Sequence, residues 1–229
     1  MLGLQSSLTQ AKARKSYDST NSMRFIPDAD YVIVSDHADF NHVTSSVSKF
    51  SVSLWFKHDD GSPEDYETLI SKWDSTGNKR EWKIAIDTND KLYATFSDDG
   101  SNTKPNTSTY VVDDTDWHHL YFRYDGSKTE EEHRVFMLVD GNTVLSLTVG
   151  SPVSDNYAEL YNGIEAGTTG ADLTIGSGQA GSSPANNFDG LIDEVCYWDG
   201  HFHKGSSNLA SVYCYNNGNP RDMRYAGGG

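Results

Sequence analysis

The sequence has 229 residues and a mass of 25.3 kDa, which is enough for one large domain or two small ones with a substantial core. It carries 33 Asp and Glu against 18 Lys and Arg, a formal charge of −15, and this acidic surplus argues against a nucleic-acid backbone as the main partner. An aromatic content of 12 % excludes a disordered chain, and a mean hydropathy of −0.62 without a long apolar run excludes a membrane-inserted one.

Residues 1–21 are polar, rich in Ser and Thr, and lack the periodicity of a strand. Residues 1–15 contain Lys12, Arg14 and Lys15 and no acidic residue, so this part is charged oppositely to the acidic remainder of the chain. The first residues also lack the charged-then-apolar order of a secretory signal, and we expect no cleavable leader. This pattern predicts an N-terminal arm that docks on neighbouring molecules.

From Ser22 to Trp198 short runs rich in β-branched and aromatic residues alternate with turns of Asp, Asn, Gly and Ser. Long polar loops are expected over residues 98–107, 150–171 and 176–187. Period-two alternation predicts that Phe50, Val52, Leu54 and Phe56 share one buried face. The expected strands are Met23–Ile26, Tyr31–Ser35, Lys49–Lys57, Thr68–Trp73, Glu81–Asp87, Lys91–Phe96, Ser108–Val112, Trp117–Tyr124, Arg134–Val139, Thr143–Val149, Asp172–Ile175 and Leu191–Trp198.

One short helix is predicted at the C-terminal end, over Ser207–Asn217, where a serine could cap the first turn and Gly218 ends the pattern. Residues 221–229 form a Gly-rich tail. Many short strands and one helix predict an all-β fold, a sandwich of two antiparallel sheets. The two cysteines, Cys196 and Cys214, are expected to be reduced, buried thiols, with a disulfide between them as the alternative.

A series of short motifs spans residues 22–220. They are Ser22-Met-Arg-Phe25, Asp30-Tyr31-Val32, Phe50-Ser-Val52-Ser-Leu54-Trp55-Phe56, Leu69-Ile70-Ser71-Lys72-Trp73, Trp117-His118-His119-Leu120-Tyr121-Phe122, Val139-Asp140-Gly141, Leu173-Thr174-Ile175-Gly176, Phe188-Asp189-Gly190-Leu191-Ile192-Asp193-Glu194-Val195 and Tyr215-Asn216-Asn217-Gly218. In this order they resemble laminin-G-like domains of the concanavalin A-like lectin/glucanase superfamily. The resemblance implies a jelly-roll sandwich with one concave and one convex sheet. The superfamily includes glycan-binding lectins, adhesion modules and glycoside hydrolases, so the fold by itself selects none of these functions.

The resemblance also bears on catalysis and on metal binding. Hydrolases of this fold carry Glu-x-Asp-x-x-Glu or Glu-x-Asp-x-Glu on one strand, and because no such motif occurs here we expect no enzyme activity. Related sandwiches often hold one structural calcium ion between the N-terminal strand and the last long strand. The corresponding ligands in this sequence would be Asp193 with Asp30 and Asp28. The alternative is that Asp193 accepts hydrogen bonds from nearby backbone and that the other two carboxylates form a turn.

Aromatic side chains are the remaining candidates for a glycan site, since a sugar face packs against an exposed ring. Trp73, Trp82 and Tyr93 are predicted near loop ends, with polar partners in Asp98–Asn106, whereas alternation assigns Trp55, Trp117 and Trp198 to the core. For each of these rings packing is the simpler interpretation, and the sequence assigns no glycan-binding residue. The histidines lack the spacing of a zinc site and are expected to be structural or exposed.

The arrangement of a short basic arm followed directly by this domain resembles that of single-domain proteins of tailed-phage virions. The resulting hypothesis is a non-catalytic decoration or adhesion protein on the surface of a phage particle. Its partners would be other virion proteins or copies of itself, contacted through the arm, and host polysaccharide, with neither nucleic acid nor membrane insertion. The alternatives are a glycan-binding module of a cellular surface or secreted protein, located extracellularly, and a glycoside hydrolase.

Overall fold

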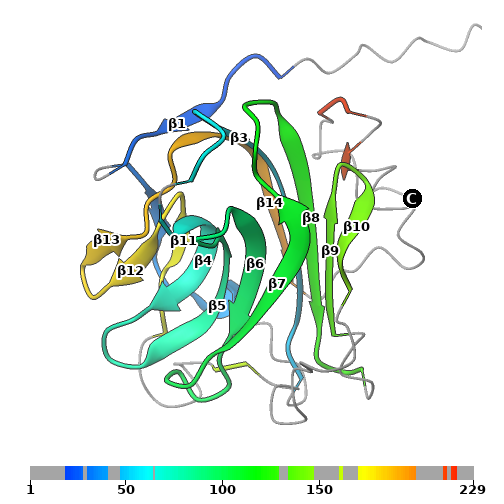
Figure 1. Ribbon diagram of the computed structural model, residues 1–229. Coiled ribbons are helices and arrows are strands. Elements are labelled where there is room, and N and C mark those ends of the chain that lie inside the picture. The colour runs from blue at the N-terminus through cyan, green and yellow to red at the C-terminus, as the bar shows by residue number, and fades with distance from the viewer. Residues whose placement is uncertain are drawn as a thin grey trace, which may run out of the picture.

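The computed structural model describes residues 19–27, 30–40, 47–63, 65–128, 134–146, 160–161, 170–199, 214–215 and 218–220. These residues form two stacked β-sheets (Figure 1). The predicted all-β sandwich is therefore confirmed. The 3-10 helix η1 (Ala38–Phe40) lies in the chain between β2 (Val32–Val34) and β3 (Lys49–His58). Within the described residues, no helix has the length and apolar character needed to cross a membrane.

The first sheet has six strands, all paired antiparallel with their neighbours. The first strand in the sequence forms one edge of this sheet and pairs with the last strand in the sequence, so the two lie side by side. The sheet order is β1 (Met23–Phe25), β14 (Gly190–Asp199), β3 (Lys49–His58), β8 (His118–Asp125), β9 (Val135–Val139) and β10 (Asn142–Ser146).

The second sheet has eight strands. Its main path is β13 (Ser183–Ala185), β12 (Gly178–Ala180), β4 (Glu67–Asp74), β5 (Lys79–Ile86), β6 (Lys91–Phe96) and β7 (Lys104–Val111). Off this path, β11 (Leu173–Ile175) pairs with both β4 and β2 (Val32–Val34).

The inner faces of the two sheets enclose one apolar core. Phe50, Val52, Leu54 and Phe56 are all fully buried, as their alternation predicts. The ring of Phe50 lies 4.8 Å from that of Trp82 in the opposite sheet, which is also fully buried. Burying each of these large side chains stabilises the fold by about 1.5–3 kcal/mol.

The other face of the six-stranded sheet is covered as well. Tyr215 stacks at 6.0 Å on Trp55 and lies 5.9 Å from His119, and Cys214 is buried beside Tyr121. Burial lowers the pKa of His119 to about 4. Cys214 and Tyr215 thus pack on β8 and β3, and Tyr215 covers part of the outer face of β3 at Trp55.

Several strand predictions need correction. The expected loop over residues 98–107 contains the start of β7, and the loop over 176–187 contains β12 and β13. These two three-residue strands contain Gly, Gln, Ser and Pro and show no apolar alternation, because backbone pairing at the sheet edge forms them. Trp117 is wrongly assigned to the core, since 38 % of it is exposed.

Some predictions concern segments outside the described residues. These are most of the arm over 1–21, the loop 150–171 apart from its last residues and positions 160–161, nearly all of the helix Ser207–Asn217, and the tail 221–229. They stay predictions.

Candidate functional site

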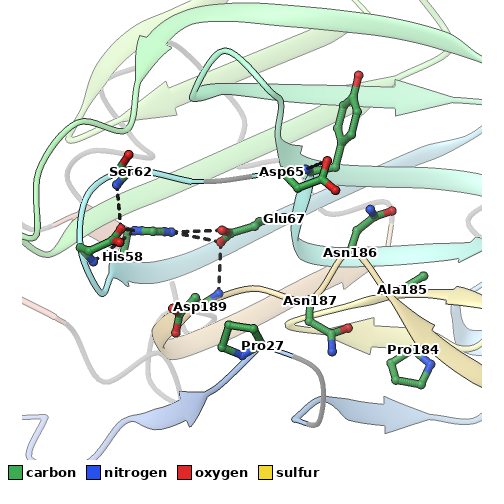
Figure 2. Close-up of a pocket in the computed structure, with 12 residues that line it drawn as sticks. Pro27, His58, Ser62, Asp65, Glu67, Pro184, Ala185, Asn186, Asn187 and Asp189 are labelled. Atoms are coloured by element: carbon green, nitrogen blue, oxygen red, sulfur yellow. Dashed lines mark hydrogen bonds and ion pairs between the residues drawn. The ribbon is translucent and has the colours of Figure 1, made fainter.

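A polar pocket of about 510 Å³ lies where strand ends of the two sheets meet (Figure 2). The end of β3, the loop after it and the start of β4 form one side, and the segment from β13 to β14 forms the other. Its lining residues are Pro27, His58, Asp60, Ser62, Asp65, Tyr66, Glu67, Pro184, Ala185, Asn186, Asn187 and Asp189.

A buried His–Glu pair holds the two sides together. His58 Nε2 lies 3.2 Å from Glu67 Oε2, and the Asp189 N–H donates to the same oxygen at 3.1 Å (Figure 2). The Gly61 N–H donates to His58 Nδ1 at 3.0 Å, so Nε2 carries the proton that faces Glu67. Burial opposes protonation of His58, but the hydrogen bond and charge of Glu67 outweigh it and raise the His58 pKa.

The loop after β3 requires glycine at one position. Gly61 has a φ of 69°, and a Cβ there would lie 2.8 Å from the Asp114 backbone. Because Gly61 also supplies the N–H that fixes the His58 ring, its conformation sets the pocket wall. This bond also occupies the nitrogen that a Ser62 nucleophile would need, so Ser62, His58 and Glu67 are not arranged as a catalytic triad.

The remaining lining groups suit a ligand rich in hydroxyls. Asp60, Asp65 and Asp189 offer carboxylate acceptors, and Asn186 and Asn187 offer side-chain amides. Burial raises the pKa of Asp189, with further contributions from the charges of Asp59 and Glu67. Beside these groups Tyr66 is 41 % exposed, which leaves a large part of the residue available to a ligand.

The structure describes two of the three predicted calcium ligands, Asp193 and Asp30. Asp193 lies on β14, where its carboxylate accepts from Ser19 Oγ at 2.6 Å and from the Glu194 N–H at 2.8 Å. Asp30 precedes β2, and Asp28 lies outside the described residues. Across the part of the chain that the structure describes, no three His, Cys, Asp or Glu side chains are placed to hold a metal ion. The N-terminal strand does pair with the last long strand, Met23 opposite Ile192, and calcium at this junction stays a prediction.

The aromatic candidates divide into two groups. Trp82 is a core residue and not a ligand-facing ring, because it sits at an inward position of β5. Trp73 and Tyr93 lie on the other face of that sheet, 8 % and 6 % exposed, next to Lys83. None of the residues 98–106 lines the pocket.

Sequence reasoning missed Tyr66, Asn186, Asn187 and Asp189. They come from turns more than a hundred residues apart, and no local pattern marks them. Their one available signal is the polar composition of turns beside strand ends, which most turns share.

Two antiparallel sheets around a single apolar core, with a polar pocket at their rim, define a jelly-roll sandwich of the lectin-like class. Residues 29–204 match the Laminin_G_3 family model, described as the concanavalin A-like lectin/glucanases superfamily, and the chain belongs to this family.

Solved structures agree on the fold. A native heptameric SAP-like pentraxin from Limulus polyphemus is 13 % identical with a TM-score of 0.50, and the match covers 76 % of this chain and 74 % of the pentraxin. A Ruminococcus gnavus IT-sialidase CBM40 bound to α2,6-sialyllactose is 10 % identical with a TM-score of 0.50, covering 84 % and 97 % of the two chains.

A structure of botulinum neurotoxin type C is 13 % identical with a TM-score of 0.53. It is described under the statement that cell entry of this neurotoxin depends on interaction with two ganglioside molecules. That match covers 80 % of this chain but only 38 % of the neurotoxin chain. At such identities these likenesses concern the fold alone. No curated protein sequence matches this chain significantly.

Proposed function

We propose that this chain is a non-catalytic carbohydrate-binding domain whose ligand occupies the pocket beside Tyr66. The observation that carries the proposal is the combination of a partly exposed tyrosine with amide and carboxylate side chains that line one cavity of about 510 Å³. A pyranose presents an apolar C–H face to a ring and hydroxyls to such polar groups. The His58–Glu67 pair stabilises the pocket wall, and its polar groups are already used in contacts with each other and with the Asp189 N–H.

Two fold neighbours support this proposal by what they bind. The Ruminococcus gnavus CBM40 structure contains sialyllactose, and the neurotoxin is described as interacting with gangliosides. Both are glycan ligands on domains of the same architecture.

A glycan array followed by calorimetry tests the proposal. Tyr66→Ala and Asn186→Ala should each weaken binding about tenfold, because they remove the stacking ring and one convergent amide. Trp117→Ala is the matched control, since Trp117 is 38 % exposed and outside the pocket, and it should leave affinity unchanged. An array without any bound glycan, or equal effects of all three variants, would contradict the assignment.

A second candidate is glycoside hydrolysis. Glu67 and Asp189 both line the pocket, and the pKa of Asp189 is raised, as for a general acid. A motif search on one strand cannot find acids that come from separate elements. Both oxygens of Glu67 face His58, however, which leaves it poorly placed as a nucleophile. Release of reducing ends from a bound polysaccharide, lost in Asp189→Asn, would establish this alternative.

We also propose that the domain is displayed on the surface of a phage particle as a decoration or adhesion protein. Its support is the basic segment ahead of an acidic body, which suits an arm docked on other virion proteins or on copies of itself, with host polysaccharide as the external ligand. Mass spectrometry of purified particles should detect the chain at stoichiometric copy number. Its absence there would favour the alternative of an extracellular module of a cellular protein.

A further inference from the structure

Lys83 lies in a cluster of aromatic rings on the outer face of the eight-stranded sheet. Its neighbours on β5, Trp82 and Ile84, point into the core, so period two turns Lys83 the opposite way. Lys83 Nζ is 5.3 Å from the ring centre of Trp73, 5.7 Å from that of Tyr93 and 6.0 Å from that of Tyr66. We call these three residues the aromatic cage.

Within the part of the chain that the structure describes, the Lys83 ammonium has no anionic partner. Lys83 is only 8 % exposed, yet among the described residues it makes neither a hydrogen bond nor an ion pair. Lys72, one strand away, shows the ordinary arrangement for a buried lysine. Its Nζ lies 2.6 Å from Asp36 and 3.5 Å from Glu81.

An unpaired buried cation is costly, and cation–π attraction offsets only part of the lost hydration. Burial lowers the pKa of Lys83 to about 8, and the charge of Arg80 adds to this. None of the acidic side chains that the structure describes forms an ion pair with Lys83, in contrast to the Asp36 and Glu81 carboxylates beside Lys72. An anionic group of a ligand would complete the site.

We infer that the aromatic cage with Lys83 is a subsite for the acidic group, a carboxylate or a sulfate, of an acidic saccharide. This inference rests on the proposed carbohydrate-binding function. Tyr66 belongs both to the cage and to the pocket, so one ligand can contact both. The carboxylates of Asp65 and Asp189 would repel an acid within the pocket, which places the acidic group at Lys83 and neutral hydroxyls at the pocket.

The experiment uses probe pairs in which one saccharide carries the acidic group and the other has it esterified or removed. Oligogalacturonate is compared with its methyl ester, and a sulfated disaccharide with its unsulfated form, by calorimetry on the full chain. The wild type should bind at least one acidic probe at least tenfold more tightly than its neutral counterpart. Lys83→Met should abolish this preference, and Lys83→Arg should retain it because arginine keeps the charge. Lys104→Met, on edge strand β7, is the control for loss of one positive charge and should behave as wild type.

Folding does not confound the test, because Lys83→Met replaces an unpaired buried charge by an apolar chain of similar length and should not lower the melting temperature. Equal binding of charged and neutral probes, or an unchanged preference in Lys83→Met, would overturn the subsite while leaving the glycan-binding proposal intact. In that case Lys83 merely packs the three rings. Failure to bind any saccharide would remove both proposals.

Discussion

Lys72 Nζ lies 2.6 Å from the carboxylate of Asp36, and both side chains are almost completely buried. Asp36 lies between β2 and η1, and Lys72 lies on β4, so the ion pair fixes the segment that follows β2 to the eight-stranded sheet. The Gly170 N–H also donates to Asp36 Oδ2 at 2.7 Å, which ties a third segment to the same carboxylate.

Asp36→Ala should therefore destabilise the fold by about 3 kcal/mol, the lower end of the cost of breaking a buried pair. The cost stays at that end because Glu81, 3.5 Å from Lys72 Nζ, can replace Asp36 as the partner of the lysine. Burial raises the pKa of Glu81 to about 8, and the charge of Asp36 adds to this rise, so Glu81 ionises more readily once Asp36 is removed. Urea denaturation measures the change. Asp39→Ala, in an exposed contact with His37, is the control and should cost less than about 0.5 kcal/mol. Equal effects of both changes would show that the pair is not structural.

Stability should also depend on pH through His118. Burial disfavours its charge, but Asp140 at 2.7 Å and Asp114 at 2.9 Å raise its pKa to about 9. A folded-state pKa above the unfolded value of 6.5 gives stability that is fully present below pH 6.5 and lost as pH rises through 9. The free energy of unfolding should fall more between pH 6.5 and pH 9.5 for the wild type than for His118→Gln. If the free energy of unfolding changed with pH in parallel for the two proteins, the contribution of the His118 contacts with Asp140 and Asp114 to stability would be disproved.

The two tryptophans whose environments differ most from expectation give a third prediction. Trp82 is fully buried against Phe50, and Trp82→Ala should cost about 3–5 kcal/mol through lost burial and a cavity. Trp117→Ala removes a ring that is 38 % exposed and should cost less than about 1 kcal/mol. Thermal or urea denaturation separates the two, and a mild effect at Trp82 would contradict its place in the core.

The calcium prediction can be checked directly. Protein purified without chelator should contain one calcium ion, and EDTA should lower its melting temperature if Asp193 is a ligand. Asp193→Asn should lose the metal and the EDTA response together. Metal-free protein with an unchanged melting temperature would leave the hydrogen bonds from Ser19 and Glu194 as the whole role of this carboxylate.

The cysteines should behave as protected thiols. Both are free in the structure, Cys214 is 2 % exposed, and burial raises the pKa of Cys196 to about 12. A thiol reagent at pH 8 should react slowly with the native protein and should count two thiols after denaturation. A count of zero in denaturant would instead reveal a disulfide between Cys196 and Cys214.

Much of the fold can be predicted from patterns of a few neighbouring residues in the sequence. The alternation of Phe50, Val52, Leu54 and Phe56 predicts that they share one buried face, because successive side chains of a strand point to opposite faces of the sheet. The run Lys91–Phe96 coincides with β6. Short strands such as β12 and the edge strand β13 escape this reasoning because backbone pairing, not side-chain pattern, forms them.

The sequence by itself determined the class of domain, most of its strands and most of its core, since apolar periodicity acts over a few residues. Only the tertiary structure decided which polar side chains meet. Glu67 accepts from the Asp189 backbone across 122 positions of sequence, and Lys83 gains its cage from three separate places in the chain. Such meetings depend on strand order and on the ends where turns converge, and no local spacing of residues encodes them.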